Sequence, residues 1–365
     1  MAVLRDIALW VAGLALIGVV VDAAVRTFVL PRGAVVRLSR LISVAMRKLF
    51  DVRIRFANTY EQRDRVMAMY SPMVLLGFVT VWLAMLVLAF SLIFLAIDGD
   101  GFTNAFTAAG SSLFTLGFAR PTGTVGTVVA FAAAAFGLGL VALLIAYLPT
   151  LYGSFSRREV LVAYLASRAG TPPRAVDLLQ RAQRIGRIDD LDDVWEKYQL
   201  WFAELEETHT SLPLLNFFRS PNPDRSWVTT AGAILDTAAL INSTVDVPFQ
   251  PMAGLLIRSG FTALRAIGDY FSIAHPPDPA PDDPITIGRE EWEAACRELE
   301  AAGVSLVADR DQAWRDFAGW RVNYDTVLVT LAGLLFAPYA PWSSDRSVSF
   351  RVSATSWGRR RRDRS

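Results

Sequence analysis

Long apolar stretches alternate with short charged ones over the first 160 residues. Three stretches, Ile7–Leu30, Met73–Ile97 and Val125–Leu148, are each about as long as the 20 or so residues that a membrane-crossing helix requires. A signal peptide explains the first stretch poorly, because Arg5 is the only basic side chain before it and no small-residue cleavage motif follows. The hydropathy pattern therefore predicts three transmembrane helices.

The first apolar stretch carries an acidic and a basic residue near its far end. Asp22 and Arg26 are four residues apart, so on a helix they share a face and are able to form an ion pair. Arg26 is equally able to extend its guanidinium to the membrane surface without a partner. Both interpretations stay open at the level of the sequence.

Residues 32–66, between the first two apolar stretches, combine many cations with interleaved apolar residues. This composition is typical of an amphipathic helix that lies on a membrane and attracts anionic lipid. Because short loops rich in Lys and Arg stay on the cytoplasmic side, we expect the N-terminus outside and this loop inside. The cations expected to face lipid are Arg37, Arg40, Arg47 and Lys48.

The segment Asp98–Gly123, between the second and third apolar stretches, is poorly suited to a fourth crossing. Its apolar middle, Phe102–Phe118, is short and interrupted by Asn104 and by several hydroxyl side chains. If this middle enters the membrane and turns back, Arg157 and Arg158 beyond the third stretch remain cytoplasmic, as the charge rule requires. A full crossing would place them outside. The pattern therefore predicts a re-entrant segment whose non-helical backbone lines protein or a watery cavity.

The turning point of this segment is suited to an ion. A cation that enters a membrane must exchange its water shell for oxygens at close range, and a run of backbone carbonyls supplies them where successive residues alternate in handedness. Gly117 tolerates the positive φ that this requires, and Thr115 adds a hydroxyl. A preceding helix over Thr103–Phe114, about 18 Å long, would point its negative end towards the middle of the membrane. The candidate filter residues are Thr115, Leu116, Gly117, Phe118 and Ala119.

In this order of outer helix, pore helix, Thr-Leu-Gly-Phe and inner helix, residues 72–158 resemble the pore-loop potassium channels with two core helices in each subunit. The filter of that family has the sequence TVGYG. The resemblance implies a homotetramer around one pore, with K⁺ as the permeant ion and no other cofactor. The predicted fold is an all-α membrane protein with a re-entrant pore helix and filter loop, followed by a mostly helical soluble domain.

The third apolar stretch extends the resemblance. Gly139 lies near the position of the family's gating hinge, Gly137 is beside it, and Pro149 stands where such helices kink near the cytoplasmic mouth. Close helix packing, which is common in membranes, is an alternative role for Gly137 and Gly139, and the two roles are compatible.

Two positions depart from the family pattern. Ala119 replaces the second filter glycine and resists positive φ. Arg120 replaces an acidic residue, so a tetramer would carry a ring of arginines at its outer mouth, which Asp98 and Asp100 would partly offset. A weakly selective or poorly conducting pore is therefore an alternative to potassium conduction. A non-conducting, membrane-anchored signalling or scaffold protein is the second functional class.

Composition excludes several other classes. With a net charge of +1, the chain is not a generally basic nucleic-acid binder. Cys296 is the only cysteine, and His209 and His275 are far apart, so we expect neither a disulfide framework nor a thiolate or histidine metal site. No nucleophile–base pair or phosphate-binding loop is evident, and we expect no enzyme. The chain has only two lysines among its cations, which we take as base composition typical of a bacterial genome.

Residues 159–342 are predicted to form a helical cytoplasmic domain, with buried helices over Trp227–Ile241 and Met252–Phe271. Charged residues within these helices are interpreted as buried ion pairs, with a ligand site as the alternative; they are Asp236, Arg258, Arg265 and Asp269. No glycine fingerprint of a nucleotide-binding regulator follows a strand.

The predicted protein of the bacterial inner membrane thus has five parts. They are an N-terminal transmembrane helix (1–31), a basic interfacial helix (32–66), the outer helix, pore loop and inner helix (67–158), the helical domain (159–342), and a disordered basic tail (343–365) able to contact anionic lipid.

Overall fold

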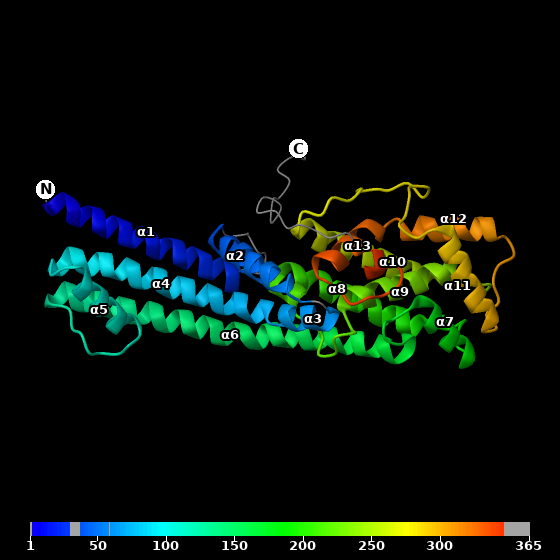
Figure 1. Cartoon of the computed structure of the whole chain (residues 1–365), viewed down its shortest axis with the longest axis horizontal. Helices are drawn as coiled ribbons and strands as arrows, with labels where there is room; N and C mark the ends of the chain where they lie inside the picture. Colours follow the sequence, from blue (N-terminus) through cyan, green and yellow to red (C-terminus); the bar gives the residue numbers. More distant parts are fainter. Residues whose placement is uncertain (1, 30–36, 58, 347–365) are drawn as a thin grey trace. The chain divides into compact units, whose positions relative to one another are not determined.

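A computed structural model describes residues 2–29, 37–57 and 59–346, and over this part the chain is helical (Figure 1). It contains no strand within those ranges, apart from an isolated antiparallel bridge between Val245 and Leu306. Three helices are long and apolar enough to cross a membrane, at Val3–Phe28, Tyr60–Asp98 and Gly123–Ala169. The predicted all-α fold with three apolar helices of membrane length is therefore confirmed.

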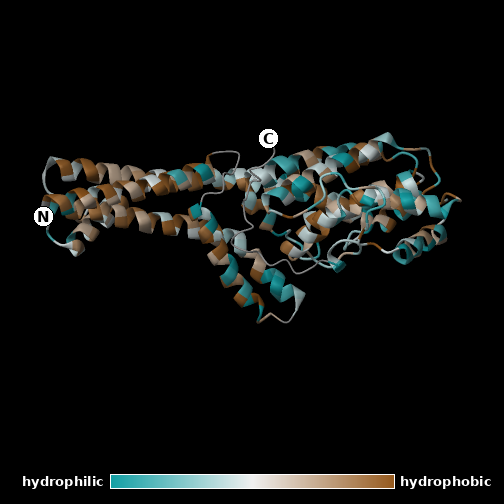
Figure 2. Ribbon diagram, turned by 90° about the horizontal axis from the view of Figure 1, so that it is seen from above, coloured by the Kyte–Doolittle hydropathy of each residue, from teal (hydrophilic) through white to brown (hydrophobic). Residues whose placement is uncertain are grey.

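The chain divides into two compact units. The first, here called the apolar unit, comprises Met1–Arg53 and Met69–Tyr152; the second, here called the C-terminal unit, comprises Ile54–Ala68 and Gly153–Ser365. In Figure 2 the helices of the apolar unit are coloured mostly as hydrophobic, whereas those of the C-terminal unit mix both colours. The junction of residues 31 and 32 and positions 347–365 of the predicted tail lie outside the described residues. The start of that tail is ordered: Ser344–Arg346 forms a short 3-10 helix, and Arg346 pairs with Glu291 and Asp345.

Helix α4 (Tyr70–Asp98) is the central helix of the apolar unit, and α1 (Ala2–Phe28) and α5 (Phe102–Leu113) both pack against it. The buried face of α4 repeats aromatic and aliphatic residues at intervals of about four, the spacing of one helical face. Phe78 stacks on Trp82 with ring centroids 5.6 Å apart, and Phe28 of α1 meets the edge of Trp82 at 5.3 Å. The unit also contains most of α2 (Arg37–Ile54) and the first part of α6 (Gly123–Ala169).

The polar pair of α1 forms within this unit. Arg26 Nε donates to Asp22 Oδ1 at 2.6 Å, and both side chains are about half exposed. Of the two interpretations of Arg26, the structure has the ion pair.

The C-terminal unit is built around α9 (Trp227–Ser243), which is buried on almost every side. Its small and apolar residues allow neighbours on all faces, as expected of a helix at the centre of a core. Helices α7, α10, α12 and α13 pack against it. Besides α9 and the last part of α6, the α-helices of the unit are α3 (Tyr60–Ala68), α7 (Ala175–Arg184), α8 (Asp192–Ser211), α10 (Pro251–Tyr270), α11 (Arg289–Ala301), α12 (Arg310–Arg321) and α13 (Asp325–Leu334).

The charges expected to pair in this core need one correction. Asp236 is buried, but its partner is Arg321 of α12, and neither Arg258 nor Arg265 contacts it. Arg258 is exposed, Arg265 donates to backbone carbonyls, and Asp269 bonds His275. The reason is helical periodicity: positions 258, 265 and 269 recur on the outer face of α10, whereas Asp236 lies on a helix that has no outer face.

Candidate functional site

The chain reverses direction between α4 and α5 through two glycines. Gly99 ends α4 at φ 68°, with its N–H donating to Leu95 O, and Gly101 precedes α5 at φ 96°. Both values lie in the region that favours glycine. The short turn Asp98-Gly-Asp-Gly thus sends α5 back along α4, against which it packs.

The C-terminus of α5 is closed by a Schellman motif. The N–H of Leu116 donates to Ser111 O at 2.8 Å, and the N–H of Thr115 donates to Ser112 O at 3.1 Å. Thr115 therefore occupies the left-handed position of the motif, at φ 56°, where glycine is the usual residue. Its hydroxyl donates to Phe114 O at 2.8 Å. The helix accordingly ends at Leu113, two residues before the left-handed Thr115.

Ser111 holds the returning backbone against α5. Its Oγ accepts a hydrogen bond from Ala119 N at 3.0 Å and donates one to Ala119 O at 3.3 Å, and its side chain is almost fully buried. Its own carbonyl receives Leu116 N and, more weakly, Gly117 N at 3.5 Å. One serine thus ties both ends of Leu116–Ala119. Sequence reasoning missed this role; the signal would have been a lone hydroxyl on the apolar face of a short helix.

Positive φ values alternate along the loop. Thr115 is at 56° and Gly117 at 75°, whereas Ala119 is not among the residues with positive φ. Gly117 thus has the backbone handedness expected of it, and the alternation stops where alanine replaces glycine.

The loop's large side chains are exposed within one chain. Phe118 is 68% exposed and Leu116 is 61% exposed, so neither side chain packs into the core of its own chain. At the expected outer mouth, Asp98 accepts from the Thr122 hydroxyl, and Asp100 and Arg120 are exposed without an ion pair in the described part of the chain.

Gly137 and Gly139 of α6 have different surroundings. A Cβ on Gly137 would lie 2.1 Å from Leu113 O, so the last turn of α5 packs directly on the backbone of α6 at this glycine. No atom lies within 4 Å of a Cβ placed on Gly139. Pro149 lies inside α6, which continues as a helix to Ala169. Close packing is therefore the observed role of Gly137, and a hinge at Gly139 or Pro149 stays a prediction.

The four cations of α2 that were expected to face lipid differ in their exposure. Arg37 and Lys48 are exposed and Arg40 is half-buried. Arg47 is only 4% exposed; its Nε lies 3.1 Å from Asp51 Oδ1, and its guanidinium lies 5.8 Å from the centre of the Tyr70 ring. The expectation that Arg47 faces lipid was therefore wrong, because the apolar face of α2 that packs on α4 includes this position.

The described residues contain no group of three or more His, Cys, Asp or Glu side chains able to hold a metal ion. Comparison with known proteins finds no family model that matches the chain, no similar curated protein and no similar solved structure.

Proposed function

We propose that the chain is one subunit of a homotetrameric cation channel of the pore-loop type, with K⁺ as the expected ion. In this proposal α5 is the pore helix, residues 115–119 form the filter, α4 is the outer helix and α6 the inner one. The protein resides in the inner membrane of a bacterium, with the N-terminus outside and the C-terminal unit in the cytoplasm. Lipid and further copies of the chain are its partners.

The observation that carries the proposal is the loop itself. A helix of twelve residues ends between two helices of membrane length, and its chain returns with positive φ at alternate residues, tied back by Ser111. Non-helical backbone at membrane depth is tolerated only where it is buried in protein or lines a water-filled cavity, and a filter is such a place.

The exposed apolar side chains of the loop support an assembly of several subunits. Leu116 and Phe118 have no neighbours that bury them in a single chain, and a ring of subunits would cover them around a shared axis. The twelve-residue helix also directs its partial negative charge towards that axis, which favours a cation.

Ion flux into liposomes tests the proposal. The purified protein is reconstituted, and uptake of K⁺, Na⁺ and Cl⁻ is measured for the wild type and for Gly117→Ala. We expect a cation flux that the substitution abolishes, because an alanine at φ 75° costs about 1–2 kcal/mol and rearranges the loop.

Gly110→Ala is the matched control, since Gly110 lies within α5 and a Cβ there meets no atom within 4 Å. It should conduct as the wild type does. Equal flux through the wild type and Gly117→Ala, or chloride flux alone, would contradict the filter assignment.

A non-conducting, membrane-anchored scaffold or signalling protein is the second candidate. It is favoured by Ala119, which does not continue the alternation, and by Arg120, an exposed cation with no ion pair among the described residues that would stand at the mouth. The purified assembly distinguishes the two: four copies in the detergent-solubilised particle favour the pore, and one or two copies without flux favour the scaffold.

A further inference from the structure

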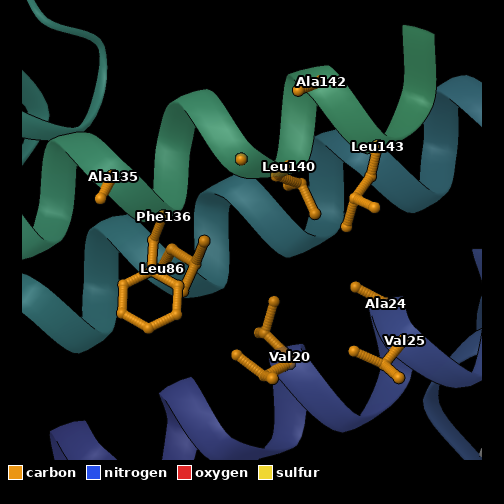
Figure 3. Close-up of a pocket in the computed structure, with 11 residues that line it drawn as sticks. Val20, Ala24, Val25, Leu86, Ala135, Phe136, Leu140, Ala142 and Leu143 are labelled. Carbon is orange, nitrogen blue, oxygen red and sulfur yellow. The ribbon is translucent and has the colours of Figure 1, made fainter. Parts of the chain in front are cut away.

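A small polar cavity of about 10 Å³ lies within the C-terminal unit, where the chain enters α9. Its lining comes from Met67 of α3, from Leu335, and from residues 216–220 and 225–227, which include the end of the 3-10 helix η1 (Pro213–Phe217) and the start of α9. The larger cavity in Figure 3, about 460 Å³ between α1, α4 and α6, is lined entirely by Gly, Ala, Val, Leu and Phe. Of the two, the small cavity is therefore the one whose side chains are able to bind a ligand by hydrogen bonds.

Three residues that line the small cavity each have a buried side-chain atom with no hydrogen-bond partner among the described residues. These atoms are Asn216 Oδ1, Ser220 Oγ and Arg225 Nε. Asn216 is 2% exposed and Ser220 is 8% exposed. The orientation of the Asn216 amide is fixed, because its Nδ2 donates to His209 O at 2.9 Å and to Pro213 O at 3.0 Å. Buried polar atoms in native proteins are almost always paired with protein or ordered water, so these three require a partner.

The three atoms restrict the chemistry of that partner. Asn216 Oδ1 needs a donor, Arg225 Nε needs an acceptor, and the Ser220 hydroxyl is able to do either. A halide ion donates no hydrogen bond and a metal ion accepts none, so neither satisfies both groups. A cavity of about 10 Å³ has room for about one water molecule, which needs two to four polar partners. Water both donates and accepts, and three partners are present.

We propose that this cavity binds one ordered water molecule. The water donates to Asn216 Oδ1 and accepts from Arg225 Nε, and the Ser220 hydroxyl is its third partner. The site is independent of ion conduction, because every residue that lines it belongs to the C-terminal unit and none to the loop at residues 115–119.

The segment that the water joins is also the segment on which α3 is held. Arg219 Nη1 lies 3.2 Å from Asp64 Oδ1, and Pro223 O accepts from the Tyr60 hydroxyl at 3.2 Å. Met67, near the end of α3, is 1% exposed and lines the cavity. A water that connects three positions of this segment therefore fixes the surface on which α3 packs, and weakening its hydrogen bonds should loosen α3.

Cryo-electron microscopy of the full-length protein in detergent, at a resolution that shows ordered water, tests the site directly. We expect one density peak within about 3.2 Å of Asn216 Oδ1, Ser220 Oγ and Arg225 Nε. A well-defined cavity without a peak would overturn the proposal. A peak whose height identifies a heavier atom would overturn it as well, because the ligand would then be an ion.

Hydrogen–deuterium exchange of the full-length protein tests the effect on α3. Ser220→Ala removes one partner of the water and Arg225→Met removes another. Each should speed exchange of the α3 amides about fivefold, the effect of one lost hydrogen bond. The amides of α12, which does not line the cavity, should be unchanged. Because both side chains bind the same water, the double variant should speed exchange by less than the product of the two single effects.

Ser305→Ala is the control, since Ser305 is exposed in the same unit and does not line the cavity. Exchange of α3 in this variant should match the wild type. Single variants at Ser220 and Arg225 that exchange as the wild type does would contradict the proposal. A double-variant effect equal to the product of the single effects would also contradict it, since the two side chains would then act independently.

Discussion

Single side chains determine the conformation of the loop that follows α5. Ser111 bonds both the N–H and the carbonyl of Ala119, and Thr115 accepts a left-handed backbone that usually belongs to glycine. A non-glycine residue at positive φ costs about 1 kcal/mol and persists only where its surroundings hold it. In this loop the hydrogen bonds to Ser111 and Ser112 hold it.

At the same scale, His209 is a neutral histidine in the core of the C-terminal unit. Its Nε2 lies 3.3 Å from Arg158 Nη1, and its Nδ1 lies 3.1 Å from Leu205 O. The carbonyl requires a proton on Nδ1, so Nε2 is the acceptor for the guanidinium. Burial, together with the charge of Arg158, holds the pKa of His209 well below its ordinary value.

We therefore expect the C-terminal unit to lose stability in mild acid. Below pH 6.5, the ordinary pKa of histidine, His209 is protonated in the unfolded chain but stays neutral in the folded chain. The free energy of unfolding should then fall with decreasing pH by up to about 1.4 kcal/mol per unit, and His209→Gln should lack this part of the slope. Denaturant titrations of both proteins at pH 7, 6 and 5 measure it; identical slopes would contradict the assignment.

At the scale of elements, α5 is positioned by its two ends. Glycines at positive φ reverse the chain before it, and the carbonyl of Leu113, its last residue, packs on α6 where Gly137 leaves room. The bounds of α5 were predicted from the sequence to within one residue, because the hydroxyl-dotted apolar run between two turn signals defines them. The contact of α5 with Gly137 was not predicted, because Gly137 and Gly139 were equally suited to close helix packing.

This asymmetry predicts opposite outcomes for two neighbouring substitutions. Gly137→Ala should lower the free energy of unfolding by about 1–3 kcal/mol, since the new methyl group would overlap Leu113 O and force α5 away from α6. Gly139→Ala should cause no such loss, because its Cβ meets open space. Thermal unfolding of both variants in detergent checks this. Equal destabilisation would mean that the helices approach each other elsewhere.

At the scale of the whole molecule, the C-terminal unit is joined to the chain's membrane-length helices through two continuous connections. Helix α3 belongs to this unit, where Asp64 lies 3.2 Å from Arg219 and Tyr60 donates to Pro223 O, and it leads directly into α4. The last part of α6 belongs to it as well. Helices α4 and α6 are therefore each continuous along the chain with the C-terminal unit.

The interior of that unit is organised by Arg321, which is fully buried. Its Nε lies 2.7 Å from Asp325 Oδ1 and its Nη1 lies 2.5 Å from Asp236 Oδ1, while Nη2 donates to Trp342 O at 2.6 Å. Burial alone would lower the pKa of Arg321, but the two carboxylates more than offset this and hold it above its ordinary value. One guanidinium thus joins α9, α13 and the C-terminal segment.

Removing the guanidinium of Arg321 should destabilise the C-terminal unit. Arg321→Met leaves two buried carboxylates without their cation, and we expect the free energy of unfolding to fall by about 3–5 kcal/mol. Arg289→Met, which breaks exposed ion pairs with Glu293 and Asp311, is the control and should change stability little. Unfolding of the full-length variants in denaturant compares them. A loss for Arg321→Met no larger than that for the control would show that the network does not stabilise the core.

The sequence by itself determined the elements of this protein, because membrane-length apolar runs, turn glycines and apolar stripes act over neighbouring residues. It also located the loop at residues 115–119 and the positive φ of Gly117. Only the tertiary structure decided which residues meet: Asp236 pairs with Arg321, eighty-five residues away, Arg47 turns inwards, and Gly137 rather than Gly139 contacts α5. Such pairings depend on the rotation and approach of whole helices, and a local pattern of residues does not specify these.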